Sequence, residues 1–439
     1  MNLDLDLRVV DACHQAAHAI ASEVTEFAEQ HTTVSIERAT ERLLDVGLDT
    51  VRQRVIERKA LRESYPPAHK PMRYVLTATG DIEQDILHAE AVANAGGDVI
   101  AVIRSTAQSL LDYVPEGPMP GGTGGTYATQ YNMRAMRQAM DAWSEKNGRY
   151  IWVSNFCSGL CMPEIAAIGV LEGLDNMVND ALYGILYRDI NMQRTLIDQR
   201  FSRMLNGWAG ITINTGEDNY LRTDDAISGA HTVTASQFIN YHLACQAGVT
   251  DEHIGLGHAF EVDPRTENSL LYELAHACLA ATLFPQCPTK FMPPTRYMDG
   301  NFYATHASDT LFNLVAVLTN QSIQTIGVPS EGMHTPQIHD RVYALQCVDY
   351  VQRATVSLSN ELELNPEGFV VRRAQSVLRA AYKLLEGIAE GGLFAAIESG
   401  VFGDVVRSRD GGKGYDGVLV RSPDYSNAIE VMCNGRTVA

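Results

Sequence analysis

Short apolar runs alternate with longer amphipathic stretches over residues 71–355. Eight runs combine β-branched, aromatic and aliphatic residues and predict buried strands, at 74–79, 99–103, 150–154, 181–186, 211–214, 253–257, 289–292 and 325–328. The stretches between them repeat apolar residues at helical spacing and predict helices over 82–95, 132–146, 163–178, 191–205, 235–247, 267–283 and 307–320. Strands and helices in this order predict an α/β protein with a (β/α)8 TIM-like barrel.

The two flanking regions lack this alternation and predict accessory structure. Residues 1–70 are expected to form an N-terminal accessory helical region, with helices over 16–29, 35–44 and 50–61 and with Ser35 as the N-cap of the second. Residues 356–439 are expected to form a C-terminal extension, with a helix over 372–390 and then the glycine-rich residues 409–414. We expect that glycine-rich segment to wrap the surface or to meet a partner.

The charge balance and the sequence termini narrow the possible partners. The chain has 439 residues and a net charge of -19, and its few lysines form no basic run. Phosphate backbones and anionic membranes bind clustered Lys and Arg, so we expect neither nucleic acid nor a membrane as partner. The start MNLDLDLRVV lacks the parts of a signal peptide, and the eight cysteines are too dispersed for a disulfide framework. A cytoplasmic protein is the simplest expectation.

Chemically useful side chains follow the predicted strands, which is where barrel enzymes carry their catalytic groups. After the strand at 99–103 the chain continues with Arg104, Ser105, Thr106, Ala107, Gln108 and Ser109. An arginine fork, hydroxyl groups and the free N–H groups of a following helix could together hold a phosphate. The alternative is a polar turn in which Ser105 caps that helix.

Other motifs give no support for a nucleotide or a metal. Residues 121–126, GGTGGT, lack the lysine of a phosphate-binding loop and follow no predicted strand. Cys157 and Cys161 lack the third cysteine of an iron–sulfur site. The string DEHIGLG at 251–257 departs from the cobalamin-binding pattern DxHxxG. No HExxH or paired CxxC motif occurs, so no metal site is predicted.

The remaining groups suit pyridoxal 5'-phosphate, which needs a phosphate cradle, an aromatic ring to stack on, a polar group at its ring oxygen and a lysine for the imine. The candidates are Arg104, Ser105, Ser109 and Ser158 for the phosphate, Tyr183 or Tyr187 for the ring face, and Asn219 for the ring oxygen. A tyrosine on a strand is more often ordinary core. Lys290, on a predicted strand, could form the imine, bind a substrate carboxylate or pair with a nearby acid, and spacing leaves these open.

Several long strings resemble the lysine 5,6-aminomutase alpha-subunit family. They are RSTAQSLLDYVP, GGTGGTYATQ, CSGLCMPEIAA, NDALYGILYRDINMQRT, INTGEDNYL, HTVTASQFIN, GLGHAFEVDP, KFMPPT and DGGKG, and they span most of residues 70–425. The resemblance implies a barrel subunit that binds pyridoxal phosphate and substrate. It implies an isomerase that also uses adenosylcobalamin and moves the terminal amino group of D-lysine or L-β-lysine from C6 to C5 by a radical route.

The resemblance also implies roles for individual residues. Tyr183 and Asn219 are implied to be catalytic, with Tyr183 stacked on the cofactor ring. Asp218 and Lys290 are implied to bind the substrate, with Lys290 at its carboxylate, and this pair favours lysine or β-lysine over ornithine. The implied cofactor-binding residues are Arg104, Ser105, Thr106, Ala107, Gln108, Ser109, Ser158, Tyr183, Arg188 and Asn219.

A second subunit is implied as well. A β subunit would bring the cobalamin domain with its DxHxxG motif and the lysine that forms the imine, in an α2β2-type assembly. The alternatives are an ornithine 4,5-aminomutase or another diamino-acid aminomutase, an inactive barrel scaffold, and a self-sufficient pyridoxal enzyme that uses Lys290. Two departures from the family pattern stand out. The chain passes directly through residues 46–52 where the family has a longer helical insertion, and Phe156 replaces a tyrosine of relatives.

Overall fold

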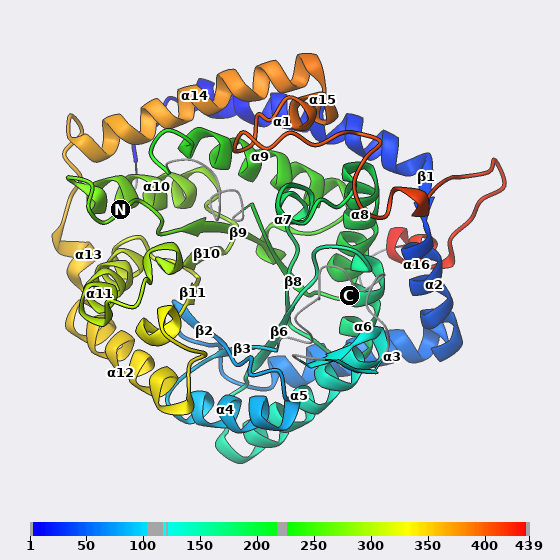
Figure 1. The fold of residues 1–439 in the computed structure, drawn as a ribbon, viewed down its shortest axis with the longest axis horizontal. Coiled ribbons are helices and arrows are strands. Elements are labelled where there is room, and N and C mark those ends of the chain that lie inside the picture. The colour runs from blue at the N-terminus through cyan, green and yellow to red at the C-terminus, as the bar shows by residue number, and fades with distance from the viewer. Residues whose placement is uncertain (1–2, 103–116, 120–121, 217–225, 436–439) are drawn as a thin grey trace.

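Parallel strands close into a barrel in a computed structural model that describes residues 3–102, 117–119, 122–216 and 226–435. In the described part, the closed sheet has the order β10-β11-β2-β3-β6-β7-β8-β9. The strands are β2 (Met72–Leu76), β3 (Val99–Ala101), β6 (Trp152–Phe156), β7 (Asn176–Val178), β8 (Thr212–Thr215), β9 (Ile254–Ala259), β10 (Thr289–Met292) and β11 (Ile323–Thr325). Figure 1 looks down this barrel, and the predicted (β/α)8 architecture is confirmed.

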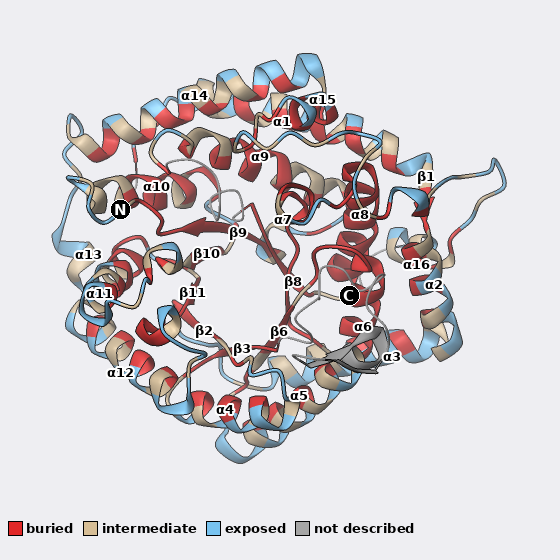
Figure 2. Cartoon of the chain, viewed as in Figure 1, coloured by how far each residue is buried: buried red, intermediate tan, exposed pale blue. Residues whose placement is uncertain are grey.

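A ring of helices surrounds the strands. The ring consists of α4 (Ile82–Asn94), α5 (Gly125–Asn147), α6 (Met162–Leu171), α7 (Ala181–Arg188), α8 (Met192–Trp208), α9 (Ala230–Gln246), α10 (Ser269–Leu283), α11 (Phe302–Leu318) and α12 (Ile338–Ala354). In most of these helices the buried residues face the strands and the exposed residues face outward, whereas α6 and α8 are buried almost all round (Figure 2). This segregation is what the helical spacing of apolar residues predicts, because one stripe of each helix must pack on the sheet.

One predicted strand is wrong. Residues 181–186 form most of α7, and the strand at this place in the barrel is Asn176–Val178, which lies inside the helix predicted over 163–178. The preceding helix α6 ends at Leu171. The apolar pattern was misleading because the true strand contains a buried polar residue, Asn176. The apolar run at 181–186 is a helix instead, which begins after Asp180, whose side chain accepts a hydrogen bond from Leu182 N.

Accessory elements pack outside the ring. At the N-terminus these are α1 (Leu7–Glu29), β1 (His31–Thr33), α2 (Val34–Val46) and α3 (Leu48–Glu63); at the C-terminus, α13 (Leu358–Glu361), α14 (Phe369–Gly391), α15 (Leu393–Glu398), β12 (Val418–Val420) and α16 (Ala428–Asn434). The N-cap of α2 is Thr33 rather than the predicted Ser35, whose hydroxyl donates to Glu164 instead. Among the described residues, no helix is long and apolar enough to cross a membrane.

The two accessory regions are joined to each other. Strand β1 pairs antiparallel with β12, and α1 and α14 lie side by side outside α9 (Figure 1). A further two-stranded sheet, β4 (Gly117–Met119) and β5 (Gly122–Gly124), precedes α5. Short 3-10 helices occur at Asp251–His253, Thr295–Tyr297, Pro329–Gly332 and Tyr415–Gly417. The ends of the chain are therefore held together on the outside of the barrel.

A belt of polar side chains crosses the barrel interior. The hydroxyls of Tyr74 and Ser154 are 3.1 Å apart, and Ser154 Oγ donates to Asn176 Oδ1 over 2.8 Å. Asn214 Nδ2 donates to the same Asn176 oxygen over 2.9 Å. Glycine at 255 leaves room for this amide, since a Cβ there would lie 2.2 Å from Asn214 Oδ1. We call Tyr74, Ser154, Asn176 and Asn214 the interior polar belt.

Candidate active site

The described residues include four of the predicted site residues. Ser158, Tyr183, Arg188 and Lys290 can be placed, whereas Arg104, Ser105, Thr106, Ala107, Gln108, Ser109, Asp218 and Asn219 lie outside the described residues. Ser158 follows β6, Tyr183 and Arg188 belong to α7 after β7, and Lys290 lies on β10. The first three lie beyond the carboxyl ends of their strands, the end at which barrel enzymes carry their active sites.

Ser158 and Tyr183 are carried by two segments of backbone in contact. A Cβ built on Gly184 would lie 3.6 Å from the Cα of Gly159, the distance of an ordinary van der Waals contact, so the two backbones lie close together. The Ser158 side chain is buried at the start of this contact, with 6 % of its surface exposed. The fold therefore brings the loop after β6 and the helix after β7 to one place.

Arg188 and Tyr183 form a pair within α7. Arg188 Nη2 donates to the Tyr183 hydroxyl over 3.0 Å, and the guanidinium carbon lies 5.6 Å from the ring centroid. Tyr187 lies beside the same ring, with centroids 5.6 Å apart. An aromatic face and a cation thus stand together on one helix, a combination that suits a flat ring bearing an anionic group.

Asp180 fixes the start of α7 and was not singled out from the sequence. Its Oδ1 accepts from Leu182 N over 3.0 Å, and its Oδ2 accepts from Gly216 N over 2.7 Å. Gly216 directly precedes the segment 217–225, which contains Asp218 and Asn219. One carboxylate therefore joins the helix of Tyr183 to the entry of that segment. An aspartate directly before residues 181–186 is typical of a helix N-cap and could have identified Asp180. It was overlooked because these residues were predicted to form a strand.

A buried arginine, Arg203 on α8, joins the strand ends beneath these residues. Its Nε donates to Asn179 Oδ1 over 3.0 Å, and its Nη2 donates to Thr215 Oγ1 over 2.9 Å and to Asn240 Oδ1 over 2.7 Å. Burial lowers the pKa of Arg203 to about 9, although the nearby Asp180 charge opposes the shift. These bonds hold β7, β8 and α9 in a fixed arrangement below α7.

Lys290 projects into the barrel interior rather than toward the surrounding helices. Its Nζ lies 5.2 Å from the centroid of the Tyr74 ring and 3.9 Å from Met292 Sδ, and 3 % of the residue is exposed. The neighbouring Phe291 points outward, because successive strand residues face opposite sides. The lysine thus extends the interior polar belt with a cation.

The glycine-rich C-terminal segment packs against the end of α7. Lys413 Nζ donates to the Arg188 carbonyl over 2.8 Å, and Lys413 N donates to the Asp189 carbonyl over 2.7 Å. Asn191 Nδ2 donates to the carbonyls of Arg409 and Gly411 over 2.8 and 2.7 Å. The sequence had left open whether this segment wraps the surface or meets a partner, and its contacts within this chain show that it covers the turn after α7.

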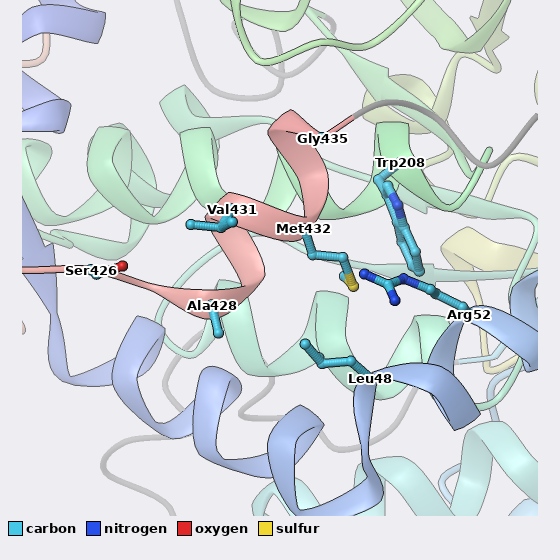
Figure 3. Close-up of a pocket in the computed structure, with 8 residues that line it drawn as sticks. All are labelled: Leu48, Arg52, Trp208, Ser426, Ala428, Val431, Met432 and Gly435. Carbon is cyan, nitrogen blue, oxygen red and sulfur yellow. The ribbon is translucent and has the colours of Figure 1, made fainter.

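A pocket of about 700 Å³ lies away from these residues. Arg52, Trp208 and Met432 converge on it from α3, α8 and α16 (Figure 3). Trp208 ends a helix that leads into a strand, so the pocket lies toward the amino ends of the strands, where barrels do not carry their active sites. Leu48, which also lines it, belongs to the short connection noted in the sequence.

Comparison with known proteins places almost the whole chain in one group. The family model "D-lysine 5,6-aminomutase TIM-barrel domain of alpha subunit" matches residues 3–48 and 41–432. The lysine 5,6-aminomutase alpha subunit of Acetoanaerobium sticklandii is 44% identical, with 98% of each chain covered. That of Fusobacterium nucleatum is 51% identical, covering 90% of this chain and 77% of its own.

A more distant relative is also found. The D-ornithine 4,5-aminomutase subunit beta of Acetoanaerobium sticklandii is 29% identical, over 81% of this chain and 50% of its own length. The first match extends over 511 positions, more than the 439 residues of this chain, so that relative has segments without a counterpart here. The two parts of the family match meet at 41–48, where Gly47 alone separates α2 from α3.

Proposed function

The chain belongs to the family of D-lysine 5,6-aminomutase alpha subunits, and from that premise we propose that it binds pyridoxal phosphate and a diamino acid in an isomerase. The reaction moves the terminal amino group of D-lysine or L-β-lysine from C6 to C5. The match along nearly the whole chain carries this proposal. When bound, pyridoxal phosphate and adenosylcobalamin supply the radical chemistry of the migration.

The described residues fit a pyridoxal phosphate site. Tyr183 offers a ring face beside the Arg188 guanidinium, and the buried Ser158 hydroxyl lies on the adjoining loop. Tyr183 would stack on the cofactor ring, and Ser158 and Arg188 would bind its phosphate or ring oxygen. Arg104, Ser105, Thr106, Ala107, Gln108, Ser109 and Asn219 complete the proposed cofactor set. The chain's part is to hold the ring in one orientation.

Lys290 would bind the substrate carboxylate. Its ammonium group is buried in the barrel interior, where an ion pair is stronger than in water because the surroundings screen it less. Asp218 would bind the amino group near that carboxylate. Holding this end of the substrate, while the cofactor holds the terminal amino group at the other end, would fix the migrating group and exclude water from the radicals. The proposed selectivity for lysine over ornithine rests on this pair.

A partner subunit would complete the enzyme. The described residues offer Lys290 as the lysine on a barrel strand, and the carboxylate role proposed for it leaves the imine lysine to another chain. A β subunit with a DxHxxG motif would supply that lysine and hold adenosylcobalamin, in an α2β2-type assembly. The alpha-subunit names of the relatives support a partner of this kind.

One experiment tests these assignments together. The chain is purified with a β subunit and assayed with D-lysine, L-β-lysine and D-ornithine in the presence of both cofactors. We expect turnover of the lysine substrates, and turnover of ornithine alone would overturn the proposal. Borohydride reduction of the loaded complex followed by peptide mapping should label the β subunit. Label on Lys290 would show instead a self-sufficient pyridoxal enzyme.

A further inference from the structure

Two histidines and a glutamate meet between the barrel wall and helix α10. His258 lies on β9, and Glu273 and His276 lie on α10. Their potential ligand atoms all lie within 4.8 Å of one another, and all three residues are buried. His258 Nε2 and Glu273 Oε2 are 3.8 Å apart. None of the three belongs to the predicted cofactor or substrate site.

The local structure explains why these residues converge. Glu273 and His276 are three positions apart, so they share one face of α10. His258 points out of the barrel toward that face, because its strand neighbours Gly257 and Ala259 alternate with it. Its ring stacks on Phe291, with centroids 5.5 Å apart and planes 11° apart. A Glu-x-x-His pair on a helix is an arrangement that holds metal ions in helical bundles.

The carboxyl groups here have buried oxygens that no described donor satisfies. Neither oxygen of Glu261 accepts a hydrogen bond from any residue the structure describes, and neither does Glu273 Oε2, although 1 % or less of each residue is exposed. Glu273 Oε1 accepts from Val262 N. A buried carboxylate oxygen without a hydrogen-bond donor is costly unless a cation or a proton stands beside it.

The two histidines lie close together beside these carboxyl groups. His258 and His276 are buried, with 3 % and 5 % of their surfaces exposed, and their ring centroids are 5.8 Å apart. Arg373 Nε donates to His276 Nε2 over the long distance of 3.3 Å. Arg373 also donates to the Ile227 carbonyl and lies 5.2 Å from the Tyr272 ring centroid, so it stays held if a metal takes its place at His276.

We propose that His258, Glu273 and His276 bind a zinc ion, with Glu261 as the neighbouring carboxylate that balances its charge. Two imidazoles and a carboxylate are ligands that zinc accepts, and a site closed to solvent is typical of structural zinc. The ion would join the end of β9 to α10. No short metal-binding motif marks these residues in the sequence, because one ligand comes from a strand and the other two from a helix, 15 and 18 residues later.

The test is metal analysis of the full, untagged chain. After dialysis against metal-free buffer, plasma mass spectrometry should find about one zinc per chain, the stoichiometry of a single closed site. Added Zn2+ should raise the melting temperature of chelator-stripped protein. Glu273→Gln should weaken zinc binding at least tenfold, as loss of a ligand or its support does. The matched control is His242→Ala, which removes a histidine from the His14–His242 contact elsewhere.

The outcomes are distinct. If Glu273→Gln fails to fold, titration of stripped wild-type chain with Zn2+ against a chromophoric chelator gives the stoichiometry directly. A chain that contains no zinc and binds none in that titration overturns the proposal. So does zinc that survives Glu273→Gln but is lost in His242→Ala. A Glu273→Gln chain that is more stable than the wild type and metal-free would show two protonated carboxyls instead.

Discussion

The Asp180 carboxylate accepts the backbone N–H of Gly216 over 2.7 Å while its other oxygen caps α7. This bond spans two neighbouring strand ends of the barrel, after β7 and after β8. It ties the helix that carries Tyr183 to the residue that precedes the segment with Asp218 and Asn219. Two groups of proposed site residues therefore depend on one buried side chain.

Replacing Asp180 tests this dependence. Asp180→Ala should destabilise the chain by about 1 kcal/mol, the typical cost of a lost N-cap, and should weaken pyridoxal phosphate binding. Asp180→Asn keeps one oxygen, which can still accept from the helix N–H, but it has no second oxygen for the N–H of Gly216. We therefore expect this variant to be almost as stable as the wild type and to bind pyridoxal phosphate more weakly. Urea unfolding and cofactor titration by absorbance measure the two effects. Full cofactor affinity in Asp180→Ala would contradict the positioning role.

Lys290 offers a second test. Lys290→Met removes the cation from the barrel interior and should raise the KM for lysine by about 30-fold, corresponding to roughly 2 kcal/mol for a hydrogen bond to a charged group. Cofactor binding should remain. Lys290→Arg keeps the positive charge, so its KM for lysine should rise less than that of Lys290→Met. Steady-state kinetics with the β subunit present measure the change, and loss of the cofactor absorbance in Lys290→Met would indicate an imine lysine instead.

Two variants of Tyr183 distinguish ring stacking on the cofactor from the hydrogen bond between Tyr183 and Arg188. Tyr183→Leu removes the ring and should raise the dissociation constant of pyridoxal phosphate roughly fivefold, because an aromatic contact contributes about 1 kcal/mol. Tyr183→Phe keeps the ring and loses only the bond from Arg188. It should therefore bind the cofactor nearly as well as the wild type. Equal losses in the two variants would exclude stacking as the role of the ring.

The interior polar belt predicts a stability effect. Gly255→Ala places a methyl group 2.2 Å from Asn214 Oδ1 and 2.8 Å from the Ile213 carbonyl. It should destabilise the chain by about 1 to 3 kcal/mol, the usual cost of overpacking. The control is Gly387→Ala on α14, where nothing lies within 4 Å and where alanine should stabilise by up to about 1 kcal/mol. Chemical denaturation of both variants measures the difference.

Glu331 predicts a pH dependence. Burial raises the pKa of Glu331 to about 7, with Arg341 opposing the shift and Asp309 close by. Because its folded pKa is raised, its contribution to stability is complete below its unfolded pKa and is lost as pH rises through about 7. Glu331→Gln should thus gain stability relative to the wild type as the pH rises from about 4.5 to about 7, by at most about 1.4 kcal/mol per pH unit. Parallel unfolding profiles for the two proteins would contradict this.

Most of the fold could be predicted from the sequence because barrel strands and surrounding helices leave different apolar spacings. The exception at residues 176–186 has a physical cause. Asn176 is buried in the interior polar belt, so its strand carries too few apolar residues to be recognised. The adjacent apolar run belongs to α7, which packs against neighbouring helices and so resembles a buried strand in composition.

Site residues could be proposed from the sequence where a polar side chain follows or lies on a predicted strand. Ser158, Arg188 and Lys290 were proposed in this way or through the family resemblance, and their roles stay predictions. Asp180 and Arg203 were not, because both act through backbone and amide groups that lie far away in sequence. The His258, Glu273 and His276 cluster was missed for the same reason. Its three side chains come close enough to bind one ion only because α10 packs on β9.

The late position of the glycine-rich segment has a consequence for biosynthesis. Lys413 bonds to Arg188 from 225 residues further along the chain, and β12 pairs with β1 later still. A ribosome makes the N-terminal part first, so the barrel strands are complete before the turn after α7 can be covered. The turn after α7 is therefore covered only when almost the entire chain has been made. Ribosome-bound chains that end before residue 409 should hold a barrel that has not yet become a binding subunit.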